Sequence, residues 1–130
     1  MAGETNLENL LRHMKPLLND GEFVFCLVDD VNEGYWQEAI GMFREKEGST
    51  LIINKTLADR FHLSYDLICS WITLTIHSSL GAVGLTAAFS AALSKEGISC
   101  NVVAAFYHDH IFVAQKDAEK AMQVLESFGR

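Results

Sequence analysis

The sequence predicts an α+β fold in which an antiparallel sheet carries helices on one of its faces. Three patterns in the second half of this 130-residue chain lead to that prediction. Residues 67–77 alternate with the period of two that a strand requires, and residues 82–92 repeat apolar side chains at helical spacing. A hairpin and a second helical stripe follow, so the predicted order is strand, helix, strand, strand, helix.

The strand at residues 67–77 has one aliphatic face and one mixed face. Ile72 and Leu74 lie on the aliphatic face, whereas Trp71 and Thr73 lie on the other. The mixed face suits packing against a second sheet or another subunit better than it suits water.

The next segment is predicted to be a capped helix. Ser78 and Ser79 offer hydroxyl groups to the free N–H groups at its start. Leu85 and Phe89 recur at helical spacing, and the helix is expected to end at Gly97.

A hairpin and a last helix complete the unit. Residues 98–106 and 111–113 are expected to be its strands, with residues 107–110 between them. The final helix starts near Lys116 and has an apolar stripe made of Ala118, Ala121, Met122, Leu125 and Phe128. Since strand–helix–strand crossovers are right-handed, both helices are expected on the same sheet face.

The first half is interpreted as a shortened, diverged copy of this unit. A helix is expected at residues 7–18, broken or ended near Pro16, followed by a strand at residues 22–28. Two strands at residues 37–43 and 49–53 and a short helix at residues 56–61 complete it. The predicted domains are therefore residues 1–65 and 66–130.

Composition limits the classes of partner. The net charge of −7 and the scattered positions of the ten Lys and Arg residues argue against nucleic acid. No apolar run is long enough to span a bilayer, and the first residues do not resemble a signal peptide. The protein is therefore expected to be cytoplasmic, without a membrane partner.

Cys26, Cys69 and Cys100 lie singly in apolar runs and are expected to be buried, reduced thiols.

The loop at residues 78–83 has the properties of a carboxylate site. Free N–H groups at a helix start attract negative charge, and Gly81 permits close approach to the backbone. The alternative is that Ser78 and Ser79 only cap the helix.

Three histidines are expected near one sheet edge. His77 ends the first strand of the unit, and the hairpin that carries His108, Asp109 and His110 is expected at the same edge. Imidazole and carboxylate groups suit a divalent metal or the charged groups of a small ligand. The third possibility is that these residues only form a solvated turn.

Four segments resemble a known family. The second half contains ITLTIHSSLGAVGL at residues 72–85, GISCNVV at 97–103 and YHDHIFV at 107–113, and the first half contains FREKEGSTL at 43–51. These segments resemble the small, tandem ACT-domain proteins of bacteria, over most of the chain. The resemblance implies two ferredoxin-like βαββα units and the binding of an amino acid or similar effector where the loop after the first strand meets a neighbouring domain.

The predicted function is that of a small-molecule-binding regulatory protein, with an amino acid as the expected effector, and not of an enzyme. The sequence has no nucleophile elbow, P-loop or dinucleotide fingerprint. Two alternatives stay open: a protein-interaction or assembly module that acts through the open sheet face, and a metal-binding protein that uses His77, His108 and His110.

The predicted ligand site combines the loop, one residue of the second matched segment and the hairpin histidines. It consists of His77, Ser78, Ser79, Leu80, Gly81, Ala82, Val83, Asn101, His108 and His110. No catalytic residue, resident metal or cofactor is predicted. The expected partners are the effector, a second copy of the chain in a homo-oligomer, and a regulated protein.

Overall fold

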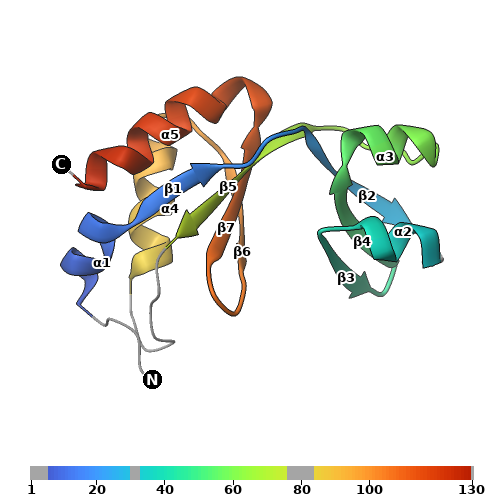
Figure 1. Ribbon diagram of the computed structural model, residues 1–130, viewed down its shortest axis with the longest axis horizontal. Coiled ribbons are helices and arrows are strands. Elements are labelled where there is room, and N and C mark those ends of the chain that lie inside the picture. Colours follow the sequence, from blue (N-terminus) through green and yellow to red (C-terminus); the bar gives the residue numbers. More distant parts are fainter. Residues whose placement is uncertain (1–5, 30–32, 76–83, 130) are drawn as a thin grey trace. The chain divides into compact units, whose positions relative to one another are not determined.

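The computed structural model describes residues 6–29, 33–75 and 84–129. The chain divides into two compact units, each with its own helices and with its own part of one seven-stranded sheet (Figure 1). The inserted unit is Asp20–Ser70, and the flanking unit is Met1–Asn19 together with Trp71–Arg130. The predicted α+β fold with duplicated ferredoxin-like units is confirmed.

The flanking unit contains a four-stranded sheet in the order β1-β5-β7-β6. Its strands are β1 (Lys15–Leu18), β5 (Ile68–Thr75, of which the part from Trp71 belongs here), β6 (Cys100–Ala104) and β7 (Asp109–Ala114). Its helices are α1 (Leu7–His13), α4 (Leu85–Lys95) and α5 (Ala118–Glu126), with short 3-10 turns at Gln115–Asp117 and Ser127–Gly129. The predicted strand, helix, strand, strand, helix order is therefore observed.

The helices of the flanking unit cover one face of its sheet. Ile72 and Leu74 of β5 and Ile111 and Val113 of β7 belong to one buried core. The helices contribute Leu10, Leu85, Phe89, Leu93, Ala121 and Leu125 to the same core. Because alternate strand residues point to opposite faces, Trp71, Thr73, His110 and Phe112 lie on the other face.

The N-terminal segment differs from the prediction. The helix ends at His13, and Lys15–Leu18 forms β1, which pairs antiparallel with β5. Pro16 disfavours helical geometry in the residue before it and donates no hydrogen bond. It is accommodated because β1 pairs with β5 alone among the described strands, so Pro16 sits in an edge strand.

The inserted unit repeats the architecture of the flanking unit. Its elements are β2 (Phe23–Val28), α2 (Glu33–Glu38), β3 (Gly41–Glu45), β4 (Gly48–Asn54) and α3 (Lys55–Arg60), followed by the first residues of β5. The strand order is β3-β4-β2-β5. Its core includes Val24, Cys26, Ile53 and Ala58.

Helix α2 was not foreseen, because a strand was expected from residue 37. Residues 37 and 38 belong to α2, and the strand β3 starts only at Gly41. The Tyr35 ring of this helix lies 5.0 Å from the ring of Phe61, measured between centroids. This contact with Phe61, at the end of α3, holds α2 against the rest of the unit. A contact between distant residues cannot be predicted from the local sequence pattern.

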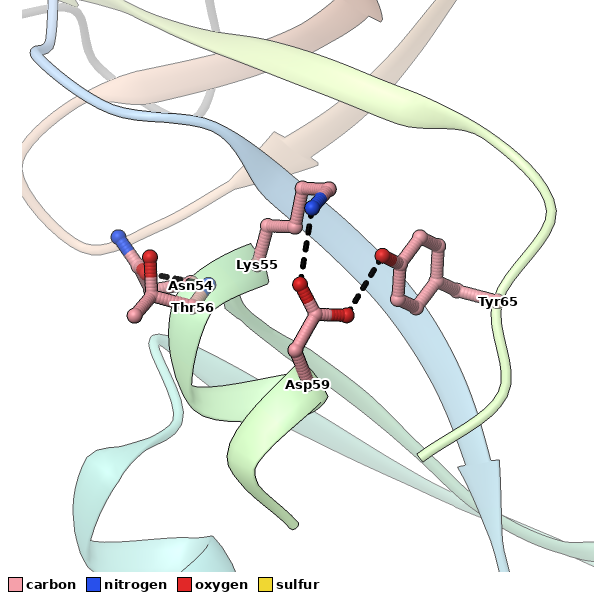
Figure 2. A network of polar contacts seen from close by, with 5 residues as sticks. All are labelled: Asn54, Lys55, Thr56, Asp59 and Tyr65. Atoms are coloured by element: carbon pink, nitrogen blue, oxygen red, sulfur yellow. Dashed lines mark hydrogen bonds and ion pairs between the residues drawn. The ribbon is translucent and has the colours of Figure 1, made fainter. Parts of the chain in front are cut away.

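A polar network fixes the start of α3 and the loop after it (Figure 2). The Asn54 side chain caps the helix by accepting a hydrogen bond of 2.8 Å from the N–H of Thr56. Asp59 accepts from Lys55 Nζ at 2.8 Å and from the Tyr65 hydroxyl at 2.7 Å. These two hydrogen bonds, Lys55 first, hold the pKa of Asp59 below its usual value of 3.8.

The flanking unit is not continuous in sequence. Leu10 and Met14 are buried in the core that contains α4 and α5, and β1 lies beside β5. Residues 6–19 therefore pack with the second half of the chain. The linear division at residues 1–65 and 66–130 stays a prediction about the extent of the two repeats.

The three cysteines are free thiols. Cys26 and Cys69 are buried as predicted, and burial raises the pKa of both thiols. Cys100 is only partly buried, because it opens the edge strand β6.

Candidate functional site

Three of the predicted site residues can be located. Asn101 lies on β6, His108 directly precedes β7, and His110 lies within β7. The others lie outside the described residues: His77, Ser78, Ser79, Leu80, Gly81, Ala82 and Val83. The predicted ligand site as a whole therefore stays a prediction.

The start of α4 is later than expected. The helix begins at Leu85, and its N-cap is Gly84, which has a left-handed φ of 93° and no side-chain capping bond. A left-handed φ favours glycine because it has no Cβ atom. The N-cap of α4 is therefore not Ser78 or Ser79, which precede its first residue by six or more positions, and the cap prediction was wrong.

The hairpin is tighter than predicted. The N–H of Ala105 donates to the carbonyl of His108 at 3.0 Å, so the turn spans residues 105–108. Asp109 and His110 are already in β7, where they pair with Ala104 and Val103 of β6. The possibility that His110 is a solvated turn residue is therefore wrong, because the β6–β7 ladder extends past it.

His110 lies in a part-buried polar network on the sheet face opposite the helices of the flanking unit. Its Nδ1 atom lies 3.0 Å from Trp71 Nε1 and 3.1 Å from Thr73 Oγ1. Asn19 extends the network, because its Nδ2 atom donates to Thr73 Oγ1 at 3.0 Å and to the carbonyl of Trp71 at 3.2 Å. The Trp71 ring stacks on Phe112 with 6.2 Å between centroids.

The directions of these hydrogen bonds follow from the atoms that can only donate or only accept. The carbonyl of Trp71 can only accept, so Asn19 presents its NH₂ group here. Thr73 Oγ1 accepts from that group and keeps its own proton for His110. Since the Trp71 N–H can only donate, His110 Nδ1 is an acceptor and the ring proton is on Nε2.

The environment of His110 favours its neutral form. Burial lowers the pKa of His110 below its ordinary value of 6.5, and the nearby His108 ring lowers it further, against an opposing effect of Asp109. Burial also raises the pKa of Asp109 above 3.8, although both histidines oppose that shift. His110 is therefore a hydrogen-bonding group rather than a cation at neutral pH.

The His110 shift predicts how stability depends on pH. As the pH falls below 6.5, the unfolded chain takes up a proton at this residue before the folded protein does. The His110 contribution is therefore complete above 6.5 and is lost as the pH falls toward the lower folded pKa. Asp109 has the opposite sign, because its contribution is complete below 3.8 and is lost as the pH rises to its raised pKa.

Urea unfolding of the protein and of His110→Asn at about pH 7 and about pH 5.5 measures the His110 contribution. The free energy of unfolding is expected to fall less on acidification in the variant. Equal pH dependence in both proteins would contradict the lowered pKa of His110.

His108 contributes an unsatisfied polar atom beside this network. Its Nδ1 atom is buried and has no hydrogen-bond partner, the only such buried side-chain atom in the described residues. The rings of His108 and His110 are 6.4 Å apart between centroids. An unsatisfied buried polar group costs about 1–3 kcal/mol, so a group that reaches it is favoured.

Asn101 lies on the same sheet face as His110, two residues along β6 from the residue that pairs with it. It is exposed and lies opposite Phe112, whereas His110 lies opposite Val103. Asn19 was missed, since the sequence signal for it depends on recognising residues 15–18 as a strand. Trp71 and Thr73 lie on the face opposite Ile72 and Leu74, as predicted, but Thr73 is buried and the contacts of both residues with His110 were not predicted.

No metal centre is formed by the part of the chain that the structure describes. It contains no group of three or more His, Cys, Asp or Glu side chains placed to hold a metal ion, and His77 lies outside it. His110 Nδ1 is also engaged by two donors. Among the described helices, none combines the length and apolar character needed to cross a bilayer.

The fold and the site are those of a duplicated ferredoxin-like protein with a part-buried polar network on the sheet face opposite its helices. Two family models, both described as ACT domain, match residues 2–70 and 67–127. The chain belongs to the ACT domain family and carries two such domains in tandem. The matches support a regulatory role based on small-molecule binding, and they favour a regulatory protein over an enzyme.

Solved structures agree with this assignment. The chain is 45% identical to a Vibrio cholerae protein of unknown function, described as a possible transport protein, with a TM-score of 0.88 over 97% of this chain and 98% of that one. A protein from Agrobacterium tumefaciens has 19% identity and a TM-score of 0.66, over 89% of both chains. The regulatory subunit of aspartate kinase from Thermus thermophilus has 8% identity and a TM-score of 0.65, over 90% of this chain and 97% of that one. The last two similarities show a shared fold. A comparison with curated proteins finds no match.

Proposed function

We propose that this protein is a non-catalytic, cytoplasmic regulatory protein that binds an amino acid, with His108 and His110 in contact with it. Membership of the ACT domain family supports the regulatory class. The loop at residues 77–83 remains part of the proposed site, as does Asn101.

The observation that carries this proposal is the pair of histidines at the start of β7. The buried Nδ1 atom of His108 has no partner in the described residues. His110 nearby presents a proton on Nε2 because its other nitrogen accepts a hydrogen bond from the Trp71 N–H. Each of these imidazole groups has a ring nitrogen without a hydrogen-bond partner in the described residues, which suits the polar groups of an amino acid.

The proposed site is expected to act in a homodimer. Strand β6 lies at the edge of its sheet and consists of Cys100–Ala104, with no charge, proline or bulge that would block pairing. The other edge strand of the flanking unit, β1, carries Lys15 and Pro16. Pairing through β6 is therefore favoured, and sedimentation measurements of the molecular mass test it.

A thermal-shift screen against each proteinogenic amino acid at millimolar concentration tests the proposed function. An amino acid present at about one hundred times its Kd is expected to stabilise the folded state by about 2.7 kcal/mol, which raises Tm by several degrees. Replacement of His108 by Ala is expected to reduce the shift. The absence of any shift across the whole set would contradict amino-acid binding.

A further inference from the structure

We infer that His110 recognises an acceptor oxygen of the effector through a fixed Nε2–H group, and that Asn19, Thr73 and Trp71 position this group. The inference rests on the proposed function and specifies the chemistry of the same site. Asn19, Thr73 and Trp71 act through His110 and are positioning residues.

The first step is that the Trp71 contact selects the tautomer of His110. The Trp71 N–H donates to His110 Nδ1 at 3.0 Å, and Thr73 Oγ1 lies 3.1 Å from the same nitrogen. A proton on Nδ1 would face the Trp71 N–H, which cannot accept it. Asn19 Nδ2 donates to Thr73 Oγ1 at 3.0 Å and so holds the hydroxyl beside the ring. A histidine without such partners would exchange between tautomers.

The second step concerns the opposite nitrogen. Nε2 of His110 makes no hydrogen bond to the described residues, and it is not among their buried unsatisfied atoms. The N–H group on Nε2 is therefore open to an external partner. A neutral N–H donor attracts a carboxylate or carbonyl oxygen and disfavours an ammonium group.

The pKa of His110 can show whether the bound oxygen belongs to a carboxylate or to a neutral carbonyl group. His108 and Asp109 are the titratable groups that affect His110, and the facing residues Trp71, Thr73, Asn19 and Val103 do not titrate. A bound carboxylate would favour the imidazolium ion and raise the pKa of His110. A neutral carbonyl oxygen would not raise it. The direction of the change on binding therefore distinguishes the two oxygen types.

Nitrogen NMR of histidine-labelled protein tests both steps. At about pH 7 the free protein is expected to show His110 as the Nε2–H tautomer. Acetate, acetamide and methylammonium then serve as probes for a carboxylate, a neutral carbonyl and an ammonium group. Acetate or acetamide is expected to shift the His110 Nε2–H signal, whereas methylammonium is not.

Two substitutions form a matched pair. His110→Asn places an amide oxygen where Nδ1 accepts from Trp71 and Thr73, but it removes the Nε2 donor. His110→Gln carries an amide N–H at the distance of Nε2. The better probe is expected to bind at least about tenfold more weakly to His110→Asn, and within about threefold of the unchanged protein to His110→Gln. Titration of the β7 amide signals measures both, and an unchanged Trp71 Nε1–H signal in His110→Asn shows that the network persists.

Three results would overturn the inference: a Nδ1–H tautomer in the free protein, a response to methylammonium only, or equal affinity of His110→Asn. A screen in which amino acids stabilise the protein while the probes leave His110 unchanged would remove this inference and leave the proposed function intact. A blank amino-acid screen together with a response to acetate or acetamide would do the reverse.

Discussion

Replacement of Phe89 by Ala is expected to lower the free energy of unfolding by about 3–5 kcal/mol. Phe89 lies in the middle of α4 and is completely buried in the core of the flanking unit. Its ring belongs to the core that α4 shares with α5 and with the strands β5 and β7. Removal of the ring leaves a cavity that the surrounding helices and strands fill only in part, so both apolar burial and packing contacts are lost.

Urea unfolding followed by circular dichroism measures this effect. Thr86 lies on the same helix but is exposed, and Thr86→Ala is expected to change the free energy of unfolding by less than about 0.5 kcal/mol. A loss below about 1 kcal/mol in Phe89→Ala would show that the α4 side of the core is not packed as described.

Replacement of Ile53 by Ala is expected to lower the free energy of unfolding by about 2–5 kcal/mol. Ile53 is completely buried on β4, where it pairs with Val24 of β2 and packs against Cys26 and Ala58. Its neighbours Cys26 and Ala58 are small, so they have little capacity to fill the space.

Phe43 provides a demanding control for Ile53. It is a larger apolar residue on the adjacent strand β3, but 71% of it is exposed. Phe43→Ala is therefore expected to change the free energy of unfolding by less than about 0.5 kcal/mol. If the two substitutions cost the same, the orientation assigned to the β3–β4 pair would be wrong.

Much of the flanking unit was predictable because its signals are local. The alternation through β5 and the helical stripes that contain Phe89 and Leu125 follow from the geometry of single elements, and all of these elements are observed. The inserted unit was less predictable. Helix α2 has a weak pattern of its own and depends partly on the contact between Tyr35 and Phe61.

The candidate site was predictable only in part. His108 and His110 were selected from their residue type and from the topology of the hairpin. The polar contacts of His110 were not predicted, because they join residues that are far apart in the sequence. Thr73 and His110 are 37 residues apart, and Asn19 and Thr73 are 54 residues apart. No local pattern reports such pairs.

The sequence by itself determined the class of fold, the duplication and the faces of the strands, since these depend on periodicities of two and 3.6 residues within short segments. Only the tertiary structure decided that residues 6–19 pack with the second half of the chain, and that Asn19 thereby reaches Thr73. It also decided which nitrogen of His110 holds the proton. Both outcomes depend on hydrogen bonds and apolar burial between distant segments, which form only when the chain has folded.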